Sequence, residues 1–128
     1  MRGSTAAVSG IAFLSLLTLG QWLRAELPPS LPALGFLLGV WPNFTAVGAI
    51  AFVGASSYVS IVRSATGAVS SACFLGCLIC SVAGLAAWEC LQILSGGRLI
   101  FDLWDLLATL SGAVIAWCCF RAFGTKRA

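Results

Sequence analysis

Runs of residues without a single charge, long enough to cross a lipid bilayer, most constrain the fold of this chain. The first covers residues 6–23 and the next covers residues 27–62. Charged residues make up 9% of the chain, whereas soluble globular proteins average about 25%. So few charges cannot cover a water-facing surface, and we therefore expect an integral membrane protein.

The number of spans follows from the length. A helix needs about 20 apolar residues to cross a hydrocarbon layer about 30 Å thick, so a chain of 128 residues has room for four. Prolines after Glu26 and the Gly96–Gly97 pair separate the apolar runs, because proline cannot continue a helix and glycine weakens one. We predict a single all-α membrane domain over residues 1–128. Its four transmembrane helices would form a compact bundle at about 6–23, 44–62, 68–94 and 103–120.

The run 27–62 is too long for one straight span. As a single helix it would measure more than about 50 Å at 1.5 Å per residue, well beyond the hydrocarbon thickness. Trp41, Pro42 and Asn43 form the natural break, which leaves residues 33–40 as a short re-entrant or interfacial helix between the first and second spans. The alternative is that residues 33–40 extend the second helix through a proline kink.

Basic residues predict the orientation, because cytoplasmic loops carry an excess of lysine and arginine. The N-terminus, the second connection and the C-terminus share one side and hold Arg2, Arg63, Arg121, Lys126 and Arg127. The opposite side holds Arg24 and Arg98. We expect a multi-pass protein with both termini in the cytoplasm, whose first apolar run is an uncleaved span and not a signal peptide.

The remaining composition narrows the chemistry. The basic residues form no patch with interleaved aromatics, so no nucleic-acid partner is expected. The six cysteines lie in apolar segments, where cysteine packs as a small hydrophobe; a redox role for the Cys77-x-x-Cys80 pair is the alternative. With no histidine in the chain, we expect no metal site and no cofactor. A divalent cation on the acidic residues is the alternative.

Three of the four acidic residues fall in one short window, which is the candidate site. The site residues that we predict are Glu89, Gln92, Arg98, Asp102, Asp105 and Thr109. The first two lie one turn apart on one stripe of the third helix, and the aspartates and the threonine share a stripe of the fourth. A short connection makes these helices an antiparallel hairpin, so the acids, Gln92 and Arg98 would meet in one crevice on the extracytoplasmic side. Ionisable residues within a span are costly and are functional candidates by default.

Each of these residues also has a structural interpretation. Asp102 and Asp105 stand where an N-cap and a first-turn acid would stabilise the fourth helix. Arg98 would be their counter-charge, and Gln92 would join two helices by a hydrogen bond. Glu89 is the hardest to explain in this way, because a buried carboxylate needs a partner or water.

The third helix carries small residues on the stripe opposite Glu89. Gly76, Cys80 and Gly84 recur at every fourth position, a pattern that lets another helix backbone approach closely. We therefore expect one face of this helix to be polar and the opposite face to pack against a neighbour.

The spacing of the polar residues resembles the signature of the VanZ-like family, which reads E-x2-Q, a Gly-Arg step, D-x2-D, then N-x2-G. Here the matching residues are Glu89, Gln92, Gly97, Arg98, Asp102 and Asp105, with Thr109 and Gly112 at the last pair. The resemblance covers roughly residues 85–115. It implies a small bacterial inner-membrane protein that acts at the cell envelope, of the kind first linked to resistance to the glycopeptide teicoplanin.

Three classes of function follow. In the leading hypothesis the pocket binds the polar headgroup of a lipid or lipid-linked glycan, and Arg98 holds a phosphate or carboxylate. The second class is a membrane-embedded lipid-modifying enzyme with Glu89 and Asp105 as acid and base. The third is a small proton-coupled transporter that uses Glu89 as a relay. The expected partners are membrane lipids or a lipid-linked envelope precursor. A transporter would in addition need to form a homo-oligomer.

Overall fold

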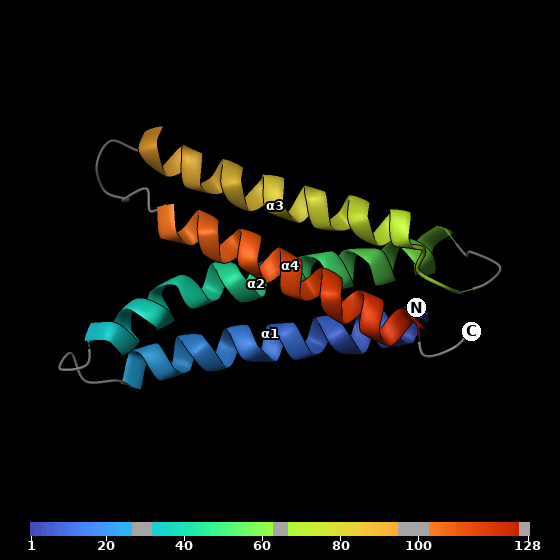
Figure 1. Cartoon of the computed structure of the whole chain (residues 1–128), viewed down its shortest axis with the longest axis horizontal. Helices are drawn as coiled ribbons and strands as arrows, with labels where there is room; N and C mark the ends of the chain where they lie inside the picture. Colours follow the sequence, from blue (N-terminus) through green and yellow to red (C-terminus); the bar gives the residue numbers. More distant parts are fainter. Residues whose placement is uncertain (27–31, 63–66, 95–102, 126–128) are drawn as a thin grey trace.

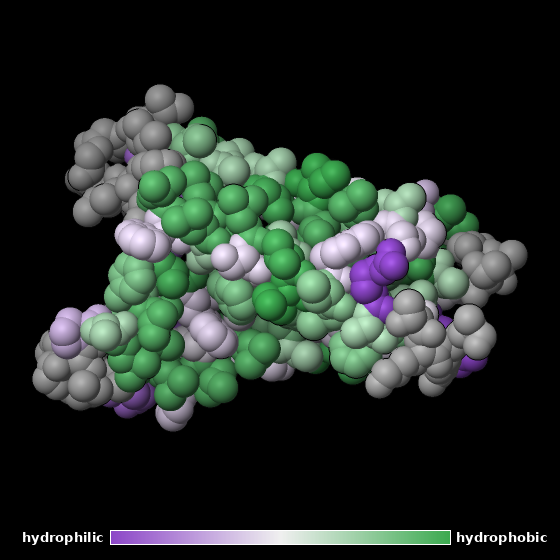
Figure 2. All heavy atoms as spheres, viewed as in Figure 1, coloured by the Kyte–Doolittle hydropathy of each residue, from purple (hydrophilic) through white to green (hydrophobic). Residues whose placement is uncertain are grey.

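The described part of the chain is helical except at residues 1–2 and 67–70. The computed structural model describes residues 1–26, 32–62, 67–94 and 103–125. These residues form four α-helices, α1 (Gly3–Glu26), α2 (Pro32–Val62), α3 (Ser71–Leu94) and α4 (Leu103–Thr125) (Figure 1). Each is long and apolar enough to cross a membrane, and Figure 2 shows a face that is mostly hydrophobic along the helices. The prediction of an all-α membrane protein with four spans is confirmed.

The second span is longer than predicted. The expected separate helix over residues 33–40 is wrong, because α2 runs without interruption from Pro32 to Val62 and contains Pro42. Its 31 residues would measure about 46 Å if straight, and Figure 1 shows its two halves running in different directions. The proline-kinked alternative is therefore the observed one.

A kink is the expected effect of Pro42. Its ring nitrogen has no hydrogen, so the Leu38 carbonyl loses its partner within the helix, and the ring pushes against that carbonyl. Just beyond the proline, the Thr45 hydroxyl donates to the carbonyls of Trp41 at 2.9 Å and Pro42 at 3.3 Å. The α2 backbone thus stays helical through the bend, and the Thr45 hydroxyl is bonded within α2.

Glycines let α1 pack closely against α2. A Cβ at Gly48 would collide with the ring of Phe13, and one at Gly20 would collide with the indole of Trp41. That indole Nε1–H also donates to the Leu16 carbonyl of α1 at 2.8 Å. Small residues that admit a bulky partner are the usual means of helix association in membranes, and here they bring α1 against both halves of α2.

The closest approach of α2 to α4 is at Gly112. A Cβ at Gly112 would collide with the Phe44 carbonyl oxygen and with the Val47 side chain. Because the Phe44 carbonyl belongs to the backbone, it cannot turn aside as a side chain could. Gly112 therefore sets the distance between the two helices.

The packing face of α3 is not the one that the sequence predicts. Among the residues that the structure describes, nothing lies within 4 Å of a Cβ built at Gly76 or Gly84, and Cys80 is exposed. The buried face instead contains Phe74, Leu78, Ser81 and Glu89. The prediction that the small residues form the packing face is wrong, because Phe74 and Leu78 pack into the bundle from the same face of α3 as Glu89.

The N-terminus and the end of α4 lie at one end of the bundle. Backbone hydrogen bonds join Gly3 N–H to the Gly67 carbonyl at 2.9 Å and Val69 N–H to the Met1 carbonyl at 2.8 Å. Gly67 has φ of 56°, a left-handed conformation that glycine adopts without strain. Figure 1 shows the N-terminus, the end of α4 and the start of α3 together at the right. Glu89, Gln92 and Asp105 belong to the opposite end.

The contact at Gly112 predicts that two glycine substitutions change the stability of the protein in opposite directions. Gly84→Ala should stabilise the protein by about 1 kcal/mol, because alanine favours a helix and meets open space there. Gly112→Ala should destabilise it by about 1–3 kcal/mol, the usual cost of overpacking. Unfolding of both variants in detergent measures the difference, and equal effects would contradict the assigned contact.

Candidate functional site

Among the residues that the structure describes, Glu89 is the only acidic one that is buried. Its side chain is 3% exposed, and it lies within two turns of the end of α3 at Leu94. It shares the buried face of α3 with Phe74, Leu78 and Ser81. Taking a carboxyl group out of water costs several kcal/mol unless other groups compensate, so the fold accepts this cost at one position on α3.

A partner of Glu89 comes from α2. The side-chain amide of Asn43 donates through Nδ2 to Oε1 of Glu89 at 3.3 Å, and Oε2 is buried as well. Asn43 directly follows Pro42, so the kink sets the position of the Asn43 amide relative to Glu89. From the sequence, Asn43 was predicted only to form part of a helix break. Its position, a strong hydrogen-bonding residue beside a proline within a span, was the signal for a buried partner.

The kink of α2 contacts each of the other three helices. We call residues 41–45 the kink segment. Trp41 bonds to α1, Asn43 bonds to α3, and Phe44 meets Gly112 of α4. The site is therefore built around α2, an element that the hairpin hypothesis left out.

On α4, two of the predicted residues are described. Asp105 is half-buried and lies in the first turn, where the positive end of the helix dipole favours a carboxylate. Thr109 is 1% exposed, and its hydroxyl donates to the Asp105 carbonyl at 2.9 Å. That bond serves the hydroxyl within its own helix, so Thr109 acts here as a small buried residue that packs near Gly112.

Of the other predicted residues, the structure describes Gln92. Gln92 is half-buried, one turn beyond Glu89 toward the end of α3. Arg98 and Asp102 lie outside the described residues. The structure thus joins Glu89 to Asn43 and places Gln92 and Asp105 near the same end of the bundle.

An apolar groove lies between the first half of α2 and the start of α4. Its volume is about 570 Å³, within the range of small-molecule sites. Its lining residues, which define the α2–α4 groove, are Leu37, Val40, Trp41, Phe44, Trp104, Leu107, Ala108 and Ser111. Phe36 packs edge-on against Trp104, with ring centroids 5.6 Å apart. The groove and the buried carboxyl therefore flank the same kink.

The described thiols and acids show no cluster that could hold a metal ion. All six cysteines are among the described residues, and each carries a free thiol. Cys77 is half-buried whereas Cys80 is exposed, so the two sulfurs of the motif face different surroundings. Within the described ranges, no three histidine, cysteine, aspartate or glutamate side chains converge on a point where a metal ion would fit.

No protein-family model, curated protein or solved structure matches this chain. The fold and the site define its class: a multi-pass α-helical membrane protein with a carboxyl group buried among its helices and held by an amide.

The bond between Asn43 and Glu89 predicts that their mutations are coupled. Asn43→Leu and Glu89→Met should each destabilise the protein, because each leaves a buried polar group without this partner. The double variant should recover about 0.6–1.7 kcal/mol relative to the sum, the average and the maximum that double-mutant cycles give for hydrogen bonds between membrane helices. Unfolding of the four proteins in detergent gives the coupling energy.

Ser81→Ala is the matched control for this cycle. Ser81 is buried on the same helix, but its hydroxyl donates to the Cys77 carbonyl at 2.7 Å, and eight residues separate it from Glu89, about 12 Å. Its effect should add to that of Glu89→Met within about 0.5 kcal/mol. Strict additivity of Asn43→Leu and Glu89→Met would show that the bond contributes nothing.

Proposed function

We propose that this protein binds the polar headgroup of a lipid or lipid-linked glycan at the end of the bundle that holds Glu89. The observation that carries the proposal is the Glu89 carboxyl, buried at 3% exposure in a span and held by Asn43. A charged group in a span costs free energy, so it is retained where a ligand or a proton needs it. Headgroup hydroxyl and ammonium groups are the natural donors to a carboxylate.

The neighbouring residues suit a headgroup better than an apolar ligand. Gln92 offers both a donor and an acceptor, and Asp105 adds a second carboxyl in the first turn of α4. Arg98, which lies outside the described residues, would supply the guanidinium that matches a phosphate or carboxylate. Asn43 would hold one oxygen of Glu89 and so orient the other.

The VanZ-like resemblance supports the same location. It covers the stretch that contains Glu89, Gln92 and Asp105, and it implies a protein of the bacterial cell envelope. The proposal therefore places this chain in the inner membrane, where envelope precursors are carried on lipids. A role in glycopeptide resistance would be one consequence of binding such a precursor.

Lipids that remain bound during purification test the proposal directly. Native mass spectrometry of the wild-type protein should detect one headgroup class above its share in the membrane. Glu89→Gln should lower that enrichment about tenfold, which corresponds to about 1.4 kcal/mol, because the amide cannot replace a charged acceptor. Arg98→Ala should act in the same direction.

Ser81→Ala controls for the loss of a buried polar group on the same helix and should leave the bound lipids unchanged. All variants are compared at equal membrane levels and equal melting temperatures. The same lipids in the same amounts on wild type and Glu89→Gln would overturn the proposal. Chemical change of a bound lipid that stops in Glu89→Ala would replace it with the enzyme hypothesis.

The proposed orientation has its own test. Arg2 and Arg121 lie at the end of the bundle that holds the termini, and Arg24 lies at the other end. By the excess of basic residues, the end with the termini should be cytoplasmic. Alkaline phosphatase fused to the C-terminus should therefore be inactive, and a green fluorescent protein fused there should fluoresce. The reverse pattern would invert the topology and turn the Glu89 end toward the cytoplasm.

A further inference from the structure

The α2–α4 groove is built by two helices that diverge. Pro42 bends α2, and the first half of the helix leads away from α4 beyond the contact between Phe44 and Gly112. Figure 1 shows the start of α4 and the start of α2 separating toward the left of the view. Side chains from both helices line the space between them. The groove is thus a consequence of the kink.

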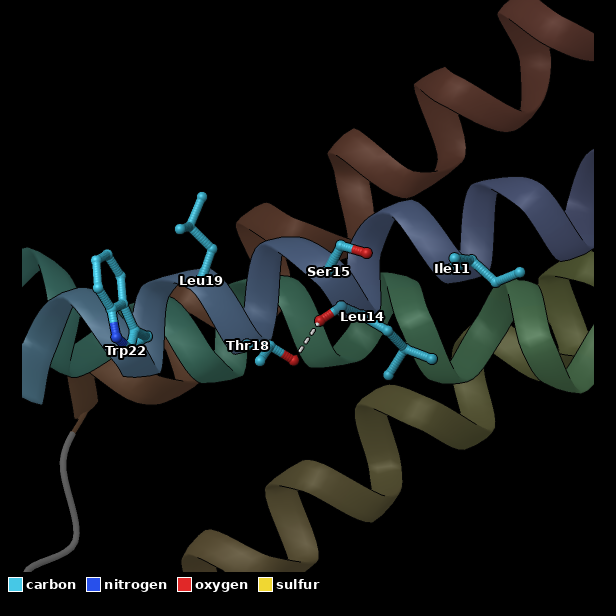
Figure 3. A pocket seen from close by; sticks show the side chains of 6 residues that line it. All are labelled: Ile11, Leu14, Ser15, Thr18, Leu19 and Trp22. Carbon is cyan, nitrogen blue, oxygen red and sulfur yellow. Dashed lines mark hydrogen bonds between the residues drawn. The ribbon is translucent and has the colours of Figure 1, made fainter.

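A second depression shows what distinguishes the groove. It lies on the outer face of α1, and its volume of about 560 Å³ is similar. Figure 3 shows that its side chains all come from one helix, among them Leu14, Thr18 and Trp22. The Thr18 hydroxyl donates to the Leu14 carbonyl at 3.0 Å. One helix surface has no second wall, so this face is ordinary lipid-facing surface and serves as an internal reference.

The walls of the groove suit a hydrocarbon chain. Apart from Ser111, every lining side chain is aliphatic or aromatic, and both helices are membrane spans. Trp104 lies in the first turn of α4, and Ser111 is about 10 Å further along the helix at 1.5 Å per residue. The groove therefore leads from the helix end, where tryptophan belongs at the membrane interface, into the hydrocarbon layer.

One polar residue stands near the mouth of the groove, and another lies beside its inner end. Asp105 follows the lining residue Trp104 directly and is about 60° around the helix axis from Ala108. Asn43 stands between the lining residues Trp41 and Phe44 in the chain. A ligand with its chain in the groove would thus hold its polar end near Asp105, at the end of the bundle that holds Glu89.

We propose that the α2–α4 groove binds one acyl chain of the lipid whose headgroup meets the Glu89 end. This inference rests on the proposed function and adds to it the hydrocarbon part of the ligand. A free sugar or free phosphate would leave the groove unused. The ligand class is therefore an amphipathic lipid and not a soluble precursor.

Photo-crosslinking tests the groove. The full-length protein is placed in vesicles of phosphatidylethanolamine and phosphatidylglycerol that contain a trace of phosphatidylglycerol with a diazirine midway along one acyl chain. Peptides of α2 and α4 that contain groove residues should be labelled about tenfold more than the outer face of α1. Equal labelling of both surfaces would overturn the inference, because the groove would then hold only bulk lipid.

Two tryptophan substitutions on α4 form a matched pair. Ser111→Trp fills the groove, whereas Leu110→Trp adds the same indole at a neighbouring exposed position outside it. Ser111→Trp should reduce groove labelling about tenfold and Leu110→Trp should leave it unchanged. Ala108→Phe repeats the test if Ser111→Trp fails to fold. Unchanged labelling in a folded groove-filling variant would overturn the inference.

The same variants separate this inference from the proposed function. If Ser111→Trp keeps the enriched headgroup class and Glu89→Gln loses it, the headgroup site stands and the acyl-chain groove is wrong. If Ser111→Trp loses both labelling and co-purified lipid while Glu89→Gln retains them, the groove stands and the headgroup site is wrong.

Discussion

The kink at Pro42 is the constraint on which the rest of the structure depends. Its neighbours bond or pack against each of the other helices: Trp41 with α1, Asn43 with α3 and Phe44 with α4. A proline inside a helix costs about 3 kcal/mol in isolation. Here the bend lets successive residues of one helix reach three neighbours, and these contacts offset the cost. The same bend opens the α2–α4 groove.

The forces at this junction are those available inside a membrane. Lipid tails are as apolar as the helix surfaces, so helices associate through close packing and hydrogen bonds. The glycines at positions 20, 48 and 112 provide the close packing, since a Cβ at any of them would collide with the adjacent helix. The Asn43–Glu89 pair provides a hydrogen bond between spans. The Asn43–Glu89 pair therefore belongs both to the packing of the bundle and to the candidate site.

The fold was largely predictable, and the failures have local causes. Hydropathy identified four spans because crossing a bilayer depends on the summed apolar character of about twenty neighbouring residues. It could not show that α2 continues through Pro42, since proline penalises every helix interior alike and only tertiary contacts offset the penalty. It also could not show which face of α3 is buried. Small residues such as Gly76 permit close packing but do not require it.

The candidate site was predictable in part. Glu89 stood out because a carboxyl group in an apolar run is costly wherever the run folds. Its partner Asn43 was missed, since 46 residues separate the two and no local rule pairs them. The α2–α4 groove was missed for the same reason, because it exists only where two distant helices diverge.

Local composition thus determines the four spans and the polar stripe near one end of the bundle. The order of the spans along the chain determines that both chain ends lie at the other end. These properties depend on residues close together in the chain and on an even number of crossings. The partner of the buried carboxyl, the packing face of α3 and the groove beside the kink depend on contacts between distant segments. Such contacts arise only when the helices pack, because glycine gaps and a bent helix set which side chains can meet.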